Sequence, residues 1–364
     1  MKVAIVHYWL VNMRGGEKVI EALLEMFPQA DIYTHVYNPQ AVSPLINSRH
    51  VFTSRINHLP FAKKLYQLYM PLMPNALMDF NLQDYDLVIS SESGPAKGVV
   101  PNPNAYHICY CHSPMRYLWD MYHEYFRGTN PLVRFFMKRL IPSLRVWDIT
   151  SANLVDCFIA NSNYVAKRIM RYYNRRPMVI NPPVNIENYL SVERKPEDFY
   201  LFFGQVTGYK RADIAIEACI KSGRKLVVAG SGARKKNRKN EKNGLVRYIG
   251  RVTDEEAVVL FSQAKALLYP GIEDFGIVPV EANAAGCPVI AYRDGGALDT
   301  VKEGVTGIFF DKQTPDSLIK AMEHFEQNEP TYSNRGVFNN HVRQFSRSAF
   351  IERMLKVLEE RKRI

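Results

Sequence analysis

Cysteine is scarce in this sequence, and its five residues follow no framework pattern. They are Cys109, Cys111, Cys157, Cys219 and Cys287. An odd number without regular spacing excludes a disulfide-rich secreted domain, and the single residue between Cys109 and Cys111 does not match a zinc or redox pair. We therefore expect reduced thiols, most of them in the core of a cytoplasmic protein.

Long hydrophobic runs are also missing. A membrane-spanning helix needs about 20 consecutive apolar residues, and the best stretch, 65–77, is interrupted by Pro71 and Pro74. The first residues, MKVAIVHYWL, carry one lysine before an apolar run, and no small-residue cleavage site follows. They predict a first buried strand and not a signal peptide.

Acidic residues are outnumbered, because 36 Asp and Glu stand against 47 Lys and Arg, a formal net charge of +11. This balance favours anionic partners such as phosphates, nucleic acid or an anionic membrane. Nucleic-acid binding is disfavoured because the sequence has no recognition-helix, zinc or stacking-aromatic motif. A length of 364 residues, 47% of them apolar, excludes a disordered or fibrous chain and predicts two domains.

Short apolar runs alternate with helical patterns almost throughout the chain. The predicted strands are 3–7, 86–90, 106–111, 157–160, 179–181, 200–204, 225–229, 246–250, 266–269, 288–291 and 307–310. The predicted helices are 17–26, 165–173, 212–221, 255–264, 278–285 and 314–325. Apolar, β-branched strands that alternate with helices indicate parallel sheets covered on both faces, so we expect two doubly wound α/β domains.

The domain boundary is predicted within 182–198, where two prolines and a polar stretch precede a new strand. The final segment, 346–363, is predicted to be a helix that docks on either domain, with Ile351, Met354, Leu355 and Leu358 on one face.

Glycines mark two candidate phosphate sites. Gly15 and Gly16 follow the first strand and open a helix, whose N–H groups suit an anion, although a plain tight turn fits equally well. Gly230 and Gly232 match the start of a dinucleotide fingerprint, but Lys235 replaces its third glycine, which makes hydride transfer a weak alternative. The basic run at 234–242 is either a solvated segment or a positive lip beside a phosphate site.

Lys210 and Arg211 follow Gly208 and are predicted in the first turn of a helix. Cations at a helix N-terminus oppose the macrodipole, so they need an anion nearby, and a diphosphate would supply it. The alternative is a pair of exposed surface bases.

Two carboxylates flank the start of another predicted helix. Glu273 lies in the loop after a strand, and Glu281 lies one turn into the helix. The N–H groups of Gly276, Ile277 and Val278 would face an anion, while both carboxylates would accept hydroxyl hydrogen bonds, as a nucleotide-sugar site requires. A glycosidase or a metal site is the alternative, but no matching His or Asp cluster is nearby.

His112 follows a predicted strand, at the sheet edge where ligands bind. A structural, hydrogen-bonded histidine is the alternative, and His107 and His123 are poorly placed to form a metal set with it.

Together these segments resemble the family-4 retaining glycosyltransferases of the GT-B fold. The resemblance covers nearly the whole chain and is strongest in PGIEDFGIVPVEANAAGCPVIAYRDGGALDTVKEGVTGIFF. YCHSPMRYLWD is similar to bacterial mannosyltransferases that build O-antigen and related polysaccharides from GDP-mannose. The resemblance implies two Rossmann-like domains facing a central cleft: 1–182 for the acceptor, 183–345 for the nucleotide sugar, and a helix at 346–364 that packs back toward the first domain.

The same resemblance implies roles for individual residues. Glu281 would hold the ribose, Glu273 would contact hydroxyls of the donor sugar, and Lys210 would neutralise the diphosphate. The remaining donor-site residues are Phe275, Gly276, Ile277 and Val278 along the main chain, Gly15 and Gly16 on the acceptor or phosphate side, His112 at the transferred sugar, and Gln205 and Arg211. Gln205 stands where the family usually has arginine, so Arg211 is expected to compensate.

The implied activity is retaining, metal-independent transfer of a mannosyl group from GDP-mannose to a lipid-linked glycan, in surface polysaccharide or lipopolysaccharide synthesis. It requires no cofactor besides the donor substrate. GDP-rhamnose or a UDP-sugar as donor, and a sugar-nucleotide epimerase of the same fold, stay open as alternatives. A phosphorylase would need a lysine-bound pyridoxal group.

The segment 127–145 mixes cations with large apolar residues. Arg134, Lys138 and Arg139 could rest on the inner, anionic face of the plasma membrane, where lipid-linked acceptors lie, and Arg116 is a further acceptor candidate. An ordinary domain helix with snorkelling bases is equally compatible.

Overall fold

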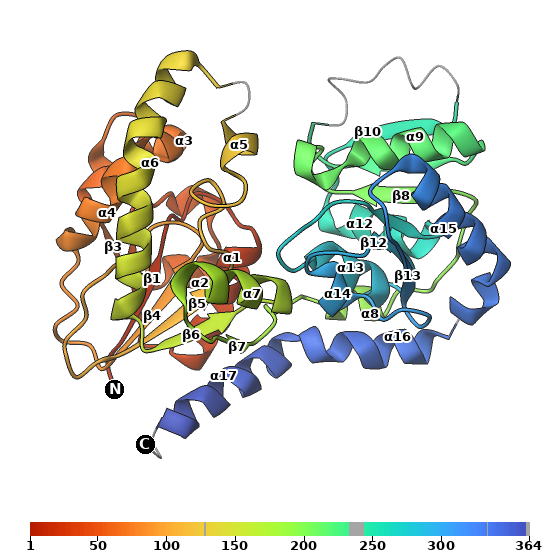
Figure 1. The fold of residues 1–364 in the computed structure, drawn as a ribbon. Coiled ribbons are helices and arrows are strands. Elements are labelled where there is room, and N and C mark those ends of the chain that lie inside the picture. Colours follow the sequence, from red (N-terminus) through yellow and green to blue (C-terminus); the bar gives the residue numbers. More distant parts are fainter. Residues whose placement is uncertain (127–128, 233–243, 333, 362–364) are drawn as a thin grey trace. The chain divides into compact units, whose positions relative to one another are not determined.

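The chain divides into two compact units, shown in Figure 1. A computed structural model describes residues 1–126, 129–232, 244–332 and 334–361. Unit 1 comprises Met1–Pro182 and Ile351–Ile364, and unit 2 comprises Pro183–Phe350. The basic run at 234–242 and Arg127 lie outside the described residues. Each unit is a doubly wound α/β domain, which confirms the predicted fold class.

Unit 1 is built on a parallel sheet in the order β3-β2-β1-β4-β5-β6-β7. Its strands are β1 (Val3–His7), β2 (Asp31–Thr34), β3 (Val51–Thr53), β4 (Leu87–Glu92), β5 (Tyr106–Cys111), β6 (Cys157–Ala160) and β7 (Met178–Val179). Strands β2 and β3 were not predicted, and the residues of β3 stay partly exposed at the edge of the sheet.

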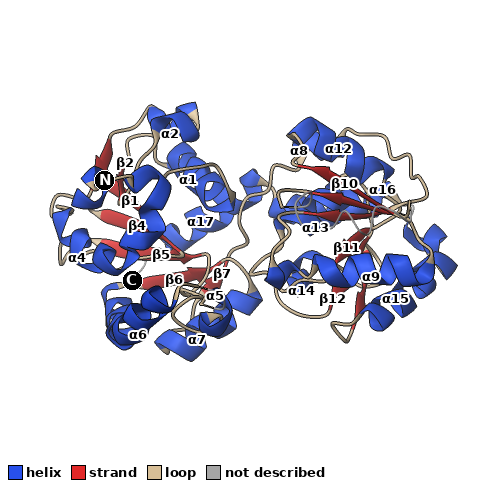
Figure 2. Cartoon of the chain, turned by 90° about the horizontal axis from the view of Figure 1, so that it is seen from above, coloured by secondary structure: helices blue, strands red, loops and turns tan. Residues whose placement is uncertain are grey.

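The helices of unit 1 lie on both sides of this sheet (Figure 2). The α-helices are α1 (Gly15–Met26), α2 (Pro44–Asn47), α3 (Ala62–Leu65), α4 (Met73–Ala76), α5 (Tyr122–Tyr125), α6 (Pro131–Ser151) and α7 (Asn163–Tyr173). The 3-10 turns are η1 (Pro39–Ala41), η2 (Arg55–His58), η3 (Tyr66–Leu72), η4 (Leu77–Asp79) and η5 (Ala152–Leu154). Among the described helices, none has the length and apolar composition that crossing a bilayer requires.

Unit 2 repeats the arrangement with a parallel sheet in the order β10-β9-β8-β11-β12-β13. Its strands are β8 (Tyr200–Phe203), β9 (Leu226–Ala229), β10 (Val246–Gly250), β11 (Leu267–Tyr269), β12 (Val289–Tyr292) and β13 (Gly307–Phe310). Its helical elements are α8 (Glu187–Leu190), η6 (Gly208–Lys210), α9 (Ala212–Ser222), α12 (Asp254–Gln263), α13 (Ile277–Ala284), α14 (Ala297–Thr300), α15 (Pro315–Gln327), η7 (Glu329–Tyr332), α16 (Arg335–Val342) and η8 (Arg343–Phe345).

Alternation along β8 builds two cores in unit 2. Leu201 packs with residues of α12 and α13 on one face, whereas Tyr200 and Phe202 pack with α9 and α15 on the other. This two-sided burial explains why the strand sequence is apolar at consecutive positions.

The last helix, α17 (Arg347–Arg361), crosses the boundary between the two units in sequence. Its buried positions are Phe350, Met354 and Val357, while Leu355 is exposed. The predicted face was therefore wrong at Leu355, because the buried stripe follows the i, i+4, i+7 spacing from Phe350.

A buried ammonium group joins several elements of unit 1. The Nζ atom of Lys97 pairs with Asp148 of α6 and lies 3.4 Å from the Oε1 atom of Glu92, and all three side chains are fully buried. Trp119 donates to Asp148 over 2.8 Å, and the Tyr173 hydroxyl donates to it over 3.0 Å. The two carboxylates hold the pKa of Lys97 above its ordinary value although burial opposes the charge.

We expect Lys97→Met to destabilise unit 1 by about 3–5 kcal/mol, because it leaves two buried carboxylates without their cation. In thermal unfolding, this should appear as a melting temperature roughly 10 °C lower. Lys356→Met is the control, since Lys356 pairs with the exposed Glu352 at the surface of the same unit. Equal, small effects of both substitutions would contradict the assigned importance of Lys97.

Candidate functional site

The predicted donor residues of unit 2 lie where its strand order reverses. Strands β8 and β11 are neighbours at the centre of the sheet, and the chain leaves their carboxyl ends toward opposite sides. This topological switch point is where doubly wound sheets bind ligands. The loop after β8 carries Gln205, Lys210 and Arg211, and the loop after β11 carries Glu273.

The loop after β8 holds Lys210 before helix α9 and not inside it. Lys210 ends the 3-10 turn η6, and Arg211 follows with a left-handed φ of 53° before α9 starts at Ala212. The expectation that both cations lie in the first helical turn was therefore wrong. The Arg211 side chain pairs with Asp213 at 2.9 Å and donates to Gln313 over 3.1 Å, while Gln205 is exposed.

Lys210 and Glu273 form an ion pair across the two loops. The Nζ atom of Lys210 lies 3.1 Å from the Oε1 atom of Glu273, and both side chains are only partly exposed. Gly271 permits this approach, because a Cβ atom there would lie 2.7 Å from the Cα atom of Lys210. The pair is thus fixed by close backbone contact between the β8 and β11 loops.

Two further glycines, Gly295 and Gly296, pack against the backbone of the Glu273 loop. The N–H of Gly296 donates to the carbonyl of Glu273 over 2.8 Å. A Cβ atom at Gly296 would lie 2.3 Å from the Cα atom of Phe275, and one at Gly295 would lie 2.7 Å from the Glu273 carbonyl oxygen. Sequence reasoning missed these supporting residues, although the adjacent glycines after a strand were a usable signal.

Helix α13 begins directly after this loop. Gly276 precedes it with a left-handed φ of 89°, and Ile277 and Val278 form its first turn. The first N–H groups of a helix have no partner within it, so they present donors at this end. The buried Phe275 packs into the core beneath them.

Glu281 lies one turn into α13, as predicted. Protein surrounds its carboxyl group although part of the side chain stays exposed, and this burial raises its pKa to about 8. The negative charge of Asp254 adds to the rise, whereas Lys210 opposes it. The structure thus gathers Lys210, Glu273 and Glu281 at one edge of unit 2.

The predicted residues of unit 1 gather at the carboxyl edge of its own sheet. Gly15 and Gly16 are the first residues of α1, and His112 follows β5. A Cβ atom on Gly16 would lie 3.6 Å from the Nε2 atom of His112, so the two are neighbours. Arg116 instead contacts the sulfur of Met121 at 3.6 Å.

The other histidines considered are placed apart from His112. The ring of His107 is hydrogen-bonded to the Ser90 hydroxyl at 2.8 Å and to the Leu154 carbonyl at 2.7 Å, and it is fully buried. His123 belongs to α5. Over the residues that the structure describes, no group of three or more His, Cys, Asp or Glu side chains is arranged to hold a metal ion.

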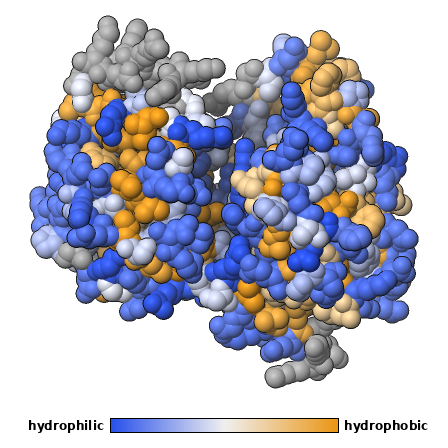
Figure 3. Space-filling view, turned by 180° about the vertical axis from the view of Figure 1, so that it is seen from behind, coloured by the Kyte–Doolittle hydropathy of each residue, from blue (hydrophilic) through white to orange (hydrophobic). Residues whose placement is uncertain are grey.

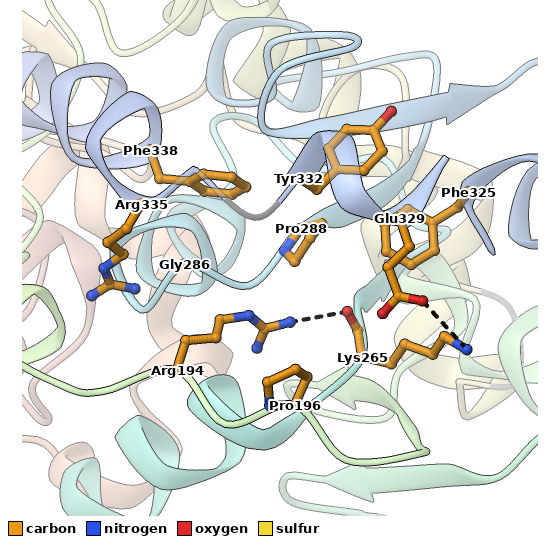
Figure 4. A pocket seen from close by; sticks show the side chains of 10 residues that line it. All are labelled: Arg194, Pro196, Lys265, Gly286, Pro288, Phe325, Glu329, Tyr332, Arg335 and Phe338. Carbon is orange, nitrogen blue, oxygen red and sulfur yellow. Dashed lines mark hydrogen bonds and ion pairs between the residues drawn. The ribbon is translucent and has the colours of Figure 1, made fainter. Parts of the chain in front are cut away.

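A separate pocket of about 260 Å³ lies near the amino ends of β11 and β12 in unit 2 (Figure 4). Arg194 donates to the carbonyl of Lys265 over 3.1 Å, and the Lys265 ammonium lies 3.8 Å from Glu329. Arg194 also donates to the carbonyls of Phe261 and Ser262 at the end of α12. These contacts stabilise a helix C-terminus, at the sheet edge opposite to the predicted site.

Two family models match adjacent parts of the chain. Residues 13–188 match the model described as Glycosyltransferase Family 4, and residues 188–344 match Glycosyl transferases group 1. The chain belongs to the family-4 glycosyltransferases.

Curated relatives of this glycosyltransferase include two mannosyltransferases. The human alpha-1,3/1,6-mannosyltransferase ALG2 is 25% identical over 261 residues, covering 61% of this chain and 62% of the relative. The Escherichia coli O-antigen chain mannosyltransferase C is 26% identical over 221 residues, covering 55% and 58%. The matches thus span about three-fifths of the length of these relatives.

Solved structures share the fold of this glycosyltransferase along its length. The lipopolysaccharide outer core galactosyltransferase WaaB matches with a TM-score of 0.72 and 16% identity, covering 99% of this chain and 100% of that one. Anabaena HepE in complex with UDP and glucose matches with a TM-score of 0.69 and 16% identity, covering 99% of both chains. These likenesses identify the fold as GT-B.

The raised pKa of Glu281 predicts a pH-dependent stability of this glycosyltransferase. The folded protein holds the proton more tightly than the unfolded chain, so stability is lost as pH rises from the ordinary value of 4.5 through about 8. Glu281→Gln should therefore melt roughly 4–8 °C above the wild type at about pH 9 and close to it at about pH 5. Glu217→Gln, an exposed change in α9, is the control, and a pH-independent difference would contradict the expectation.

Proposed function

We propose that this chain is a retaining, metal-independent glycosyltransferase that moves a mannosyl group from GDP-mannose to a lipid-linked glycan acceptor. The observation that carries the proposal is the gathering of Lys210, Glu273 and Glu281 at the switch point of unit 2, beside the N-terminus of α13. A cation and helix N–H groups suit a diphosphate. The Glu273 carboxylate and the carboxyl group of Glu281, which keeps its proton up to about pH 8, both suit the hydroxyls of sugar and ribose.

Before the donor binds, the Lys210 ammonium is paired with the Glu273 carboxylate. A diphosphate carries more charge than one carboxylate, so it competes for the Lys210 ammonium. The freed Glu273 carboxylate then accepts hydrogen bonds from the donor sugar, and Glu281 accepts them from the ribose. Arg211, which pairs with Asp213, would have to exchange this partner to compensate for Gln205.

The reaction requires stabilisation of the departing nucleoside diphosphate. Lys210 and the N–H groups at the start of α13 would provide it by preorganised electrostatics. The sugar passes through an oxocarbenium-like state, and the acceptor hydroxyl attacks the face that the diphosphate leaves, transferring its proton to the leaving phosphate. His112 and Gly15–Gly16 of unit 1 are assigned to the transferred sugar and to the acceptor or phosphate side.

The donor is assigned from the relatives. ALG2 and the O-antigen enzyme are named mannosyltransferases, which supports mannose. HepE binds UDP and glucose in its crystal structure, so a UDP-sugar is the second candidate. A thermal-shift panel of GDP-mannose, GDP-rhamnose and UDP-sugars separates them, because a ligand stabilises the protein by mass action. Release of nucleoside diphosphate that depends on an acceptor distinguishes a transferase from an epimerase.

Lys210→Ala should lower kcat by about 100- to 1,000-fold, the usual effect of removing one charge-stabilising donor. The loss arises because the developing diphosphate charge keeps only the helix N–H groups. Turnover is measured as nucleoside diphosphate released with acceptor present. Lys221→Ala, an exposed lysine of α9 that pairs with Glu217, is the control. Near-normal turnover of Lys210→Ala would refute the assigned role.

The acceptor side is assigned to an apolar and basic surface of unit 1, which we call the α6 surface. Its exposed apolar residues are Phe61, Leu65, Leu68, Leu72, Met78, Leu132, Val133, Phe135, Phe136, Leu140, Val146 and Ile149. Met70 of η3 packs in one cluster with Met137 and Leu144, so these segments are neighbours in unit 1. Apolar side chains also lie among hydrophilic ones on the face drawn in Figure 3.

The charge of the α6 surface suits an anionic membrane. Lys63, Lys64, Arg134, Lys138 and Arg139 are exposed within it. The segments 59–78 and 129–147 contain no acidic residue. Apolar side chains flanked by cations bind anionic lipid through burial and electrostatic attraction together, which supports a peripheral position at the cytoplasmic face of the plasma membrane.

The protein should therefore sediment with vesicles that contain anionic lipid, and binding should weaken as salt rises. The double variant Phe135→Ser, Phe136→Ser should bind about tenfold more weakly, since two aromatic anchors are lost. Val259→Ser, which removes an exposed apolar residue of α12 in unit 2, is the matched control. If anionic vesicles at low salt fail to sediment the wild type, the membrane assignment is wrong.

A further inference from the structure

A line of polar side chains leads from His112 into the interior of unit 1. The Nε2 atom of His112 lies 2.8 Å from the Ser91 hydroxyl oxygen. That oxygen lies 3.0 Å from the Nδ1 atom of His7, and the Nε2 atom of His7 lies 3.9 Å from the Oε1 atom of Glu17. We call these residues the His112 relay.

The topology of unit 1 brings the relay together. His7 ends β1, and Ser91 is its register partner on the neighbouring strand β4. His112 follows β5, the next strand of the sheet, and Glu17 lies in the first turn of α1. The carboxyl ends of three adjacent strands and one helix N-terminus therefore contribute one polar group each.

The inner part of the relay is shielded from water. His7 and Ser91 are 0% exposed and Glu17 is 2% exposed. Burial opposes ionisation of Glu17, but its interaction with His7 and the N–H of Arg14 outweighs this and holds the pKa of the carboxyl below its ordinary value. The N–H of Arg14 donates to the Oε2 atom of Glu17 over 2.9 Å, so that the Oε1 atom faces His7.

Other charged and titratable groups also surround this inner part. Tyr8 follows His7, and a Cβ atom on Gly16 would lie 3.0 Å from its hydroxyl. Burial and the charge of Glu17 raise the pKa of Tyr8, while Arg14 opposes the rise and Glu92 adds to it. Tyr8 therefore keeps its proton beside the relay, and Glu17 is the anion that faces the His7 ring.

Each hydrogen bond of the His112 relay has a defined donor and acceptor, which follow from the charge of Glu17. At 3.9 Å the Glu17 carboxylate is beyond hydrogen-bond distance of His7 Nε2, and among the described residues this nitrogen has no hydrogen-bond partner, so Glu17 acts on the ring through its charge. A buried anion at this position favours the form of His7 with a proton on Nε2, which leaves Nδ1 as an acceptor. The single proton of the Ser91 hydroxyl then points to His7 Nδ1. The Ser91 oxygen consequently accepts from His112, which then carries its proton on Nε2.

We propose that Glu17 is a positioning residue that sets the tautomer of His112 through His7 and Ser91. The inference rests on the proposed role of His112 at the transferred sugar. With its proton on Nε2, the His112 ring donates to Ser91 and carries no proton on Nδ1. A buried carboxylate that fixes an imidazole tautomer for catalysis is an established device in enzymes, and here a serine and a second imidazole extend its reach.

Glu17→Gln tests the direction of the relay. A glutamine suits the same position in a capping box, so the N-terminus of α1 is retained. Its amide can donate to His7 Nε2, which would move the His7 proton to Nδ1, turn the Ser91 proton toward His112 and leave His112 protonated on Nδ1. Ser91→Ala is the second variant, because it cuts the relay without touching Glu17 or the helix cap.

The readout is ¹⁵N NMR of histidine-labelled full-length protein near pH 8, where imidazoles are mostly neutral. His112→Asn assigns the signals, since the protonated and unprotonated ring nitrogens resonate separately. We expect the Nε2-protonated form of His112 in the wild type and in Glu21→Gln, the control on the same helix, and the Nδ1-protonated form in Glu17→Gln. The same His112 tautomer in wild type and Glu17→Gln overturns the proposal.

Kinetics supply the second measurement. Glu17→Gln and Ser91→Ala should each lower kcat about 10- to 100-fold while nucleoside diphosphate still binds, because the donor's diphosphate is assigned to unit 2. A wild type that transfers no sugar from any donor would refute the proposed function alone, since the NMR result stands independently. A normal kcat in both variants with a changed tautomer would refute the link to catalysis.

Discussion

The carboxyl edge of the sheet in unit 1, where the predicted residues of that unit lie, depends on the ion pairs of the buried Lys97 ammonium group. It pairs with Glu92 at the end of β4 and with Asp148 in α6. Glu92 in turn accepts the N–H groups of Ala96 and Lys97 with its carboxylate and the N–H of His112 with its carbonyl. Because breaking a buried pair leaves an uncompensated charge, the end of β4 has little freedom to move. Ser91 and His112 are therefore held in place by a charge that neither of them touches.

In unit 2, the carboxyl edge of the sheet is held by close backbone contacts and not by a buried charge. Gly271 and Gly296 have no Cβ atom, so backbone segments approach each other there more closely than any other residue would permit. The approach brings Lys210 and Glu273 to ion-pair distance, and it orients the loop that starts α13. A larger residue at either glycine would displace the loop even though no functional side chain is changed.

Much of this architecture follows from local sequence patterns. The strands 3–7, 106–111, 157–160, 246–250 and 307–310 were predicted to the residue. Short, mainly apolar runs bounded by turn residues are typical of the strands of parallel sheets. All five cysteines are free, and four are buried, as expected for core thiols. The weak edge strand β3 depends on neighbours that no local pattern reveals, and so does the continuation of helix α6 through Pro142 to Ser151.

The candidate site was predictable only in part. Glu281 and Glu273 could be placed on a helix and a loop from spacing alone, whereas their link to Lys210 depends on β8 and β11 being adjacent. His7 and Ser91 escaped prediction because polar residues at the ends of apolar strands give no local signal of a site. Their partnership arises from strand register across 84 residues of chain. The exposed apolar positions of α6 likewise became visible only once the buried side was known.

The division of the chain has a consequence for its synthesis. Unit 1 is discontinuous, since 183–350 separates its two parts. A ribosome delivers 1–182 first, and the segment from Ile351, which contains the buried Met354 and Val357, emerges only after all of unit 2. Residues 1–182 are therefore synthesised without the C-terminal segment of their unit, and part of their apolar surface stays uncovered while unit 2 folds. Nascent unit 1 is the stage at which we expect this chain to depend most on chaperones.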